Sequence, residues 1–301
     1  MPSHSDRYYQ SSGRIPFVAT PLMIAAGVVA AFVLSLPLVL IATFVDRVVV
    51  ALMCSLGLGV LAGLTVRGIG RLAQVRHPDF ARFVGLVVGV FAVYFAWVWF
   101  AWGVNEFNIP VLQDRFAHPE HLLRDMQGLA AVGPWSIAGY TPRGWELYGV
   151  WIAEAVSIIV LTVSMSADDA ETYCERCRRW TRDSGLLVRM PLCDPDELRR
   201  TLEADLYGIL DDLRQQPCDM QDRHDLKIAE CPGCADSNYL TIERMTVTKD
   251  ADKKTVTTSR PIVTNLIVPR ALVEHLALPV FDGNPAYGSI PEPEPEAVEV
   301  S

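Results

Sequence analysis

Four long apolar runs constrain this chain more than any other feature. They cover residues 20–41, 48–66, 82–103 and 147–165. Each run has about the length that a helix needs to cross a hydrocarbon layer of about 30 Å. Because a helix satisfies its own backbone hydrogen bonds inside lipid, we predict an α-helical membrane bundle of four transmembrane helices, with the lipid bilayer as its partner. The first run is longer than a signal-peptide core and lacks a small-x-small cleavage site, so it is expected to remain as an anchor.

The charges are divided unevenly between the two halves of the chain. Residues 1–165 hold ten Arg, no Lys and nine acidic residues, whereas residues 166–301 hold 16 basic and 26 acidic residues. The net charge of −9 is therefore the sum of +1 from residues 1–165 and −10 from residues 166–301, so the acidity lies in the C-terminal part. An acidic domain does not attract a phosphate backbone, so no nucleic-acid partner is expected.

The distribution of arginine predicts the orientation in the membrane. The short loop after the second run carries Arg67, Arg71, Arg76 and Arg82, and the much longer loop 105–146 carries three arginines. Cytosolic loops of membrane proteins hold the excess of positive charge. We therefore predict a multi-pass protein of the bacterial cytoplasmic (inner) membrane with both termini cytosolic and an outer loop 105–146.

This pattern divides the chain into four parts. Residues 1–19 are predicted to be a cytosolic N-terminal tail, and residues 20–166 the four-helix membrane domain. Residues 167–290 follow as a small cytosolic α+β domain. The last segment, residues 291–301, is rich in Pro and Glu, cannot bury a core and is expected to be disordered.

Two Cys-x-x-Cys pairs give the C-terminal domain its chemistry. They are Cys174 with Cys177, and Cys231 with Cys234. The cytosol disfavours disulfides, and two short turns that each present two thiolates form the tetrahedral set that structural zinc takes. We predict that these four cysteines hold a structural zinc ion. The 53 residues between the pairs exceed the usual spacing of about 15–20, so the sequence predicts a split zinc ribbon with a large insertion.

The residues within and after this insertion have readable patterns. Residues 186–192 are typical of a strand, and a leucine stripe predicts one helix over 194–216 with Asp194 as its N-cap. The segments 238–250 and 251–269 are rich in β-branched residues and predict a hairpin. A short helix is expected over 270–277.

The remaining cysteines leave alternatives open. Cys193 and Cys218 bracket the insertion helix, where they are either a second thiol pair or buried free cysteines. Thiol–disulfide redox chemistry at the Cys-x-x-Cys pairs is the rival of metal binding. A redox pair of that kind follows a strand and opens a helix, whereas Cys174 follows a membrane span, so metal is favoured. Cys54 is interpreted as a packing residue of the second span.

Glu154 is an ionisable residue within the fourth span. Such a group is a functional candidate because its burial in lipid costs free energy unless it is protonated, paired or hydrated. One reading is a proton or cation step, which would make the chain a transport or ion-coupled component. The other is a neutral carboxyl group that hydrogen-bonds to Tyr94, a tryptophan N–H or the backbone. The structural reading is favoured.

Small residues recur on the second span. Ser55, Gly59 and Gly63 follow one another at four-residue spacing, which permits close packing between helices. A homo-oligomer that forms through this face is one expected use.

The outer loop contains a second possible ligand set. Residues 118–133 predict a short helix that lies on the outer leaflet or caps the bundle. His118, Glu120 and His121 make a weak metal pattern at its start, and a solvated helix start is the favoured interpretation.

Three short segments resemble a family of bacterial inner-membrane proteins with four spans and a C-terminal cytosolic Cys-x-x-Cys domain. They are Ser12-Gly13-Arg14-Ile15-Pro16 before the first span, Val75-Arg76-His77 after the second and Cys174 to Trp180 after the fourth. The likeness covers about two thirds of the chain. It implies the same architecture and brings no activity with it.

These observations favour a non-enzymatic role. His224 and His275 are the cytosolic histidines away from the membrane, and neither belongs to a recognisable catalytic arrangement. We expect the zinc domain to be a docking or assembly module for a cytosolic or membrane protein, because zinc stabilises folds whose core is too small to stand alone.

Overall fold

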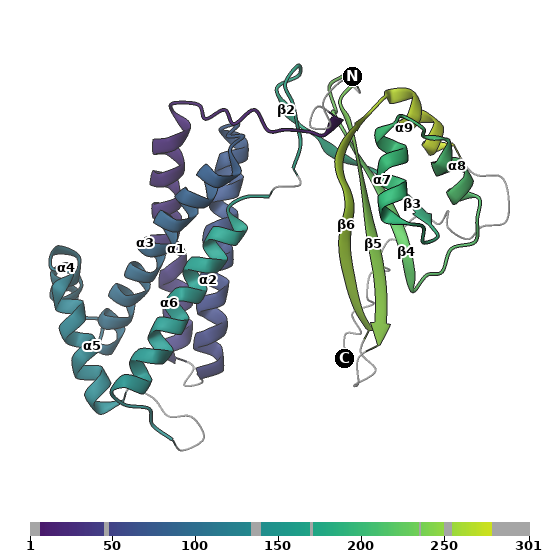
Figure 1. Ribbon diagram of the computed structural model, residues 1–301. Coiled ribbons are helices and arrows are strands. Elements are labelled where there is room, and N and C mark those ends of the chain that lie inside the picture. The colour runs from purple at the N-terminus through teal and green to yellow at the C-terminus, as the bar shows by residue number, and fades with distance from the viewer. Residues whose placement is uncertain are drawn as a thin grey trace, which may run out of the picture. The chain divides into compact units, whose positions relative to one another are not determined.

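The computed structural model describes residues 7–44, 48–133, 140–168, 171–234, 236–249 and 255–278. The chain forms two compact units, which we call the helical unit and the sheet unit (Figure 1). The helical unit is Ser12–Asp169, and the sheet unit combines Met1–Ser11 with Ala170–Ser301. The expected Pro/Glu tail, residues 291–301, lies outside the described residues.

Four long helices build the helical unit. They are α1 (Ala19–Phe44), α2 (Val48–Leu72), α3 (Pro78–Val104) and α6 (Trp145–Met165). All four are long and apolar enough to cross a membrane, as the sequence predicted. Large apolar side chains remain exposed along them, as is expected of helices that face lipid. Examples are Val29, Val33, Phe83, Val90, Ile152 and Val160.

The second and third helices extend beyond their predicted apolar runs. The run in α2 ends at Val66, but the helix continues through Arg67 and Arg71 to Leu72. The third helix begins at Pro78, because the His77 ring accepts a hydrogen bond from the Phe80 N–H at 3.1 Å and so caps the helix. The length of an apolar run therefore predicts the part of a helix that is suited to lipid. The ends of the helix itself are set by capping residues and turns.

Glycines bring α2 close to α6. A Cβ atom added at Gly59 would lie 2.8 Å from the Ile158 carbonyl oxygen, and one at Gly63 would lie 2.6 Å from the Thr162 carbonyl oxygen. The Thr162 hydroxyl also donates to the Gly59 carbonyl at 3.2 Å. The small-residue face of the second span thus packs within the chain's own bundle. We therefore do not propose self-association through Gly59 and Gly63.

Two shorter helices lie between α3 and α6. The second of them, α5 (Glu120–Val132), is the helix that the sequence predicted, and Leu122 and Ala130 on its apolar face are buried against the bundle. The first, α4 (Ile109–Ala117), was not predicted. The Tyr94 hydroxyl holds α4 to α3 by donating to the Arg115 carbonyl at 3.2 Å.

The sheet unit contains a four-stranded antiparallel sheet with the order β3-β4-β5-β6. Its strands are β3 (Arg182–Met190), β4 (Asp222–Glu230), β5 (Asn238–Lys249) and β6 (Thr255–Val268). The expected strand before the insertion helix and the expected hairpin are therefore both present. In the core, Leu226 lies opposite Ile242 and Ile228 opposite Leu240, so alternate residues of each strand face the same layer.

Helices cover one face of this sheet (Figure 1). They are α7 (Pro195–Glu203), α8 (Gly208–Arg214) and α9 (Arg270–Ala277), the last as predicted. The prediction of a single helix over 194–216 was wrong. Asp205 adopts a left-handed backbone conformation with φ 61°, which ends α7 and turns the chain before α8. Two short helices lay the leucines on the sheet, and Leu206, at the break, stays exposed.

Residues 7–9 belong to the sheet unit, and we call them the N-terminal clamp. Their contacts are the Arg7–Asp205 ion pair at 2.8 Å, the antiparallel bridge of Tyr8 to Leu266 on β6, the Tyr9 N–H that donates to the Asn265 carbonyl at 2.9 Å, and the Tyr9–Tyr239 ring pair with centroids 5.2 Å apart. Part of the segment that the sequence assigned to a separate tail is thus integrated into the folded C-terminal domain.

Candidate metal centre

The two Cys-x-x-Cys pairs occupy two turns between paired strands of the sheet unit. Cys174 ends β1 (Tyr173–Cys174), which pairs with β2 (Arg179–Trp180), and Cys177 lies in the turn that joins them. Cys231 and Cys234 lie in the turn that connects β4 to β5. The register of each strand pair fixes the position of its turn, so the fold itself brings together cysteines that are far apart in the sequence.

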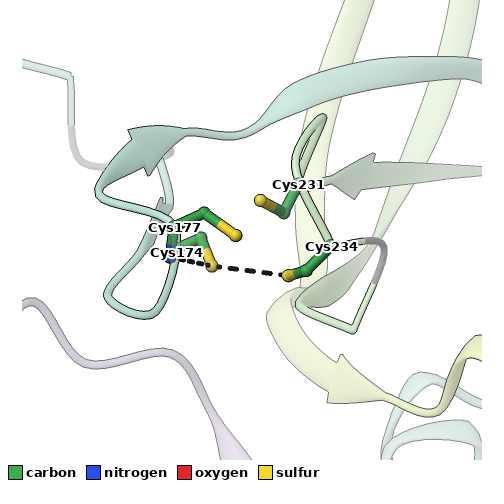
Figure 2. A group of neighbouring side chains, drawn as sticks. All are labelled: Cys174, Cys177, Cys231 and Cys234. Atoms are coloured by element: carbon green, nitrogen blue, oxygen red, sulfur yellow. Dashed lines mark hydrogen bonds between the residues drawn. The ribbon is translucent and has the colours of Figure 1, made fainter.

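The four thiols converge on one point, as Figure 2 shows. All four sulfur atoms lie within 4.8 Å of one another, and the Cys174 and Cys234 sulfurs are 3.8 Å apart. A tetrahedral ion with metal–sulfur bonds of about 2.3 Å requires sulfur–sulfur distances of about 3.8 Å. The spacing of these cysteines therefore fits a tetrahedral metal ion with little movement.

Hydrogen bonds to sulfur hold the turns in this arrangement. The Cys177 N–H donates to the Cys174 sulfur at 3.4 Å, and the Gly233 N–H donates to the Cys231 sulfur at 3.3 Å. The Ser237 hydroxyl donates to the Cys174 sulfur at 3.3 Å. Donors directed at sulfur favour the thiolate, which is the form that binds a metal.

Gly233 lets the two turns approach each other. A Cβ atom at this position would lie 3.0 Å from the Cys177 sulfur and 3.2 Å from the Cys177 Cβ. Any side chain would therefore press the opposite turn away. The glycine in Cys231-Pro-Gly-Cys234 has a packing role that the Cys-x-x-Cys spacing alone does not reveal.

The thiols of the cluster differ in pKa because their surroundings differ. Burial alone would raise the pKa of Cys174, but hydrogen bonds from Ser237 and the Cys177 N–H, together with those of the Cys231 and Cys234 thiols, outweigh it and lower that pKa to about 7. The pKa of Cys177 is raised to about 12, first by its hydrogen bond with Cys234 and then by burial. Neighbouring negative charges resist full ionisation of the cluster. A bound divalent cation would compensate those charges and let all four cysteines act as thiolates.

The four-cysteine site is partly enclosed by the protein. Cys174 and Cys231 are buried, Cys177 and Cys234 are half-buried, and the buried Tyr173 ring packs edge-on against Trp180 at 5.1 Å. Four protein ligands would leave no position for water or substrate, which is the arrangement of structural sites. An exposed Arg176–Asp236 ion pair at 2.6 Å also links the two turns, and the sequence pattern had not indicated it.

Cys193 and Cys218 have different partners. The Cys193 sulfur lies 3.6 Å from Nδ1 of His224, and the Cys218 thiol donates to the Asp219 carbonyl. The contact between Cys193 and His224 was not expected from the sequence, because 31 residues separate them. Burial, with Asp194 as the next cause, raises the pKa of Cys193, so this thiol is protonated and poorly nucleophilic near neutral pH.

Glu154 lies within the helical unit and faces α2. Its carboxyl group accepts a hydrogen bond from the Ser55 hydroxyl, a partner that the sequence analysis did not name. The two residues line a cavity of about 150 Å³, together with Cys54, Trp97 and Trp151. Tyr94, one of the partners that the sequence analysis named, instead donates to the backbone of α4. The small-residue spacing of the second span is the signal that would have pointed to Ser55.

Two of the three segments that carry the family resemblance meet in the structure. The Arg76 N–H donates to the Arg14 carbonyl at 3.0 Å, and the Arg76 guanidinium donates to the Ser12 hydroxyl at 3.3 Å. The segment before α1 therefore packs on the turn between α2 and α3. Comparisons of the chain with protein-family models, with curated proteins and with solved structures found no match.

Proposed function

We propose that this chain is a multi-pass protein of the bacterial inner membrane whose cytosolic domain is stabilised by a structural zinc ion and acts as a non-enzymatic docking or assembly module. The convergence of four cysteine sulfurs within 4.8 Å carries the proposal. The split zinc ribbon would consist of the β1–β2 turn and the β4–β5 turn, with β3, α7 and α8 inserted between them.

The N-terminal clamp supports the proposed topology independently of the arginine count. Residues 7–9 pack in the sheet unit with the strands that follow α6, which supports a topology in which the segments before α1 and after α6 lie on the same side of the membrane. Four crossings, an even number, satisfy this requirement. The arginines in and beside the α2–α3 turn, which are Arg67, Arg71, Arg76 and Arg82, support the cytosol as this side.

The donor set favours zinc over other metals. Four thiolates are soft ligands, and a tetrahedral four-sulfur site is typical of zinc or of iron–sulfur chemistry. Zinc requires no redox partner and commonly occupies pairs of Cys-x-x-Cys turns. A closed site with four protein ligands favours a structural role. A metal-stabilised domain attached to a membrane bundle favours docking over catalysis.

The test is the metal content of the full-length chain, purified in detergent under reducing conditions and dialysed against a mild chelator. We expect about one retained zinc per chain. Cys231→Ser should lose it, and the matched control Cys218→Ser should keep it, because Cys218 lies outside the cluster. Cobalt in place of zinc should give the sulfur-to-metal charge-transfer absorption of a four-thiolate site, which tests ligation in the unmutated chain.

A metal-free protein that stays folded and whose Cys174–Cys234 region cycles between thiol and disulfide would overturn the zinc site. It would instead support the thiol–disulfide redox alternative, for which the 3.8 Å distance between these sulfurs is the relevant observation.

A second candidate function, transport or ion coupling through Glu154, is favoured by the cavity beside it. The cavity places a carboxyl group, a hydroxyl group and two tryptophan rings within one apolar space of about 150 Å³. Uptake of protons or cations into proteoliposomes that contain the protein should then be lost in Glu154→Gln. It should be kept in Glu146→Gln, which changes a carboxyl group in the first turn of the same helix. Neither substitution should alter the retained zinc.

A further inference from the structure

The turn between α4 and α5 brings two imidazoles to one carboxylate. Nδ1 of His118 lies 3.2 Å from one oxygen of Asp114, and Nδ1 of His121 lies 2.7 Å from the other. One ligand atom from each of the three residues falls within 4.8 Å of the others. The sequence had grouped the two histidines with Glu120, and the structure replaces Glu120 with Asp114.

From this geometry we propose a second metal site at Asp114, His118 and His121, which takes a borderline divalent cation such as Zn²⁺. Two imidazole nitrogens and one carboxylate oxygen suit zinc and its neighbours in the first transition row. The all-oxygen sets that Mg²⁺ and Ca²⁺ prefer are not formed here. The site is separate from the four-cysteine centre and does not depend on it.

The local backbone fixes the direction of the three side chains. The His118 N–H donates to the Asp114 carbonyl at 2.8 Å and closes the last turn of α4, while the His121 N–H donates to the His118 carbonyl at 3.0 Å. The chain therefore makes one tight turn between the two histidines. Their rings stack at 27° with centroids 5.2 Å apart, and both present Nδ1 to Asp114.

The distances leave room for an ion after a small adjustment. Bonds of about 2.0–2.1 Å in a tetrahedron place neighbouring ligand atoms about 3.3 Å apart. The observed separations of 3.2 Å and 2.7 Å are near this value or slightly below it. Side-chain rotation of His121, which is half-buried, would open the shorter one.

Arg115 positions the carboxylate. Its Nε and Nη2 donate to the two oxygens of Asp125 on α5 at 2.6 Å and 3.0 Å, and its Nη1 donates to Asp114. A carboxylate fixed by a second hydrogen-bonding partner is the usual support of a metal ligand. The guanidinium charge also lowers the affinity for a cation, so we expect a weaker and more exchangeable site than the four-cysteine centre.

Exposure distinguishes the two sites as well. The side chains of Asp114, His118 and His121 are 35 %, 54 % and 27 % exposed. Three protein ligands leave the fourth position to water or to another ligand. An ion here would join the end of α4 to the start of α5 and would be open to exchange with the surrounding solution.

The experiment uses the full-length chain in detergent, without a histidine tag, with zinc retained at the cysteine centre. Zn²⁺ is titrated by calorimetry into this protein and into His121→Ala, His118→Ala and the matched control Glu120→Gln. We expect one additional Zn²⁺ per wild-type chain, a loss of affinity of at least about tenfold in either histidine variant, and no change in Glu120→Gln.

Two further measurements guard against misfolded variants. Each variant should keep its retained zinc at the cysteine centre and, without added metal, should unfold at nearly the wild-type temperature. Added Zn²⁺ should raise the unfolding temperature of the wild type and of Glu120→Gln, but not that of His121→Ala. If the wild type takes up no additional Zn²⁺, or if His121→Ala binds it equally well, the three residues form only a hydrogen-bonded network and the proposal is wrong.

Discussion

His224 on β4 is fully buried, and its Nε2 has no hydrogen-bond partner among the described residues. Burial, and after it the nearby Arg244, lowers the pKa of His224. The unfolded imidazole titrates near pH 6.5, so between the lowered pKa and about 6.5 the unfolded state binds more protons than the folded state. We therefore expect the sheet unit to keep its full stability above about pH 6.5 and to lose stability as the pH falls below it.

Thermal unfolding at pH values between about 7.5 and 5.5 measures this loss. The wild type should lose more of its unfolding temperature over this interval than His224→Gln, which carries no titrating group at this position. Zinc content must be measured at each pH, because protonation of the thiolates also releases metal. Equal slopes for the two proteins would show that the buried imidazole does not govern the response.

At the scale of elements, the contact between α2 and α6 depends on missing side chains. In Gly63→Ala, the new Cβ would lie 2.6 Å from the Met165 Cβ and 2.6 Å from the Thr162 carbonyl oxygen, so the helices must separate. We expect destabilisation of about 1–3 kcal/mol. Gly57→Ala is the matched control, because a Cβ there meets no atom within 4 Å and alanine favours the helix. Unfolding in detergent, followed by tryptophan fluorescence, should separate the two variants.

Most of the helices and strands were predicted from the length of the apolar runs and from the spacing of apolar residues. The four long helices, the β5–β6 hairpin and α9 follow from the hydrophobic pattern, because burial selects for it directly. The break between α7 and α8 does not follow from the hydrophobic pattern, because the leucine stripe continues across Asp205. The break places the leucines of two separate helices against the same sheet. The sequence analysis also missed the short α4, because none of its residues is buried and no buried stripe marks it.

The two candidate metal sites differ in how readable they are. Cys-x-x-Cys spacing marks each turn locally, so the four cysteines could be grouped before the fold was known. Asp114 and His121 lie on different helices whose angle depends on the turn at His118 and Pro119, and no spacing rule supplies that angle. The same limit applies to Ser55 and Glu154, which are 99 residues apart and meet through helix packing.

At the scale of the whole molecule, the proposed topology predicts which residues are reachable from outside an intact cell. The native cysteines should resist a membrane-impermeant maleimide, because the proposed topology places them in the cytosol or within the membrane. Arg143→Cys, exposed in the loop before α6, should react in intact cells, whereas Thr257→Cys on β6 should react only after permeabilisation. Labelling of Thr257→Cys in intact cells would contradict the topology.

The N-terminal clamp also fixes an order of events during synthesis. Tyr8 precedes the four long helices in the chain and is made before them, whereas its strand partner, Leu266, is made after them. Residues 7–9 can therefore take their place in the sheet unit only after the helical unit has been made. A fragment of residues 166–301 would lack residues 7–9 and would leave β6 uncovered at Asn265 and Leu266, where its edge is open to pairing with other chains. Adding a peptide of residues 1–11 should then reduce its aggregation, since the peptide restores the missing edge.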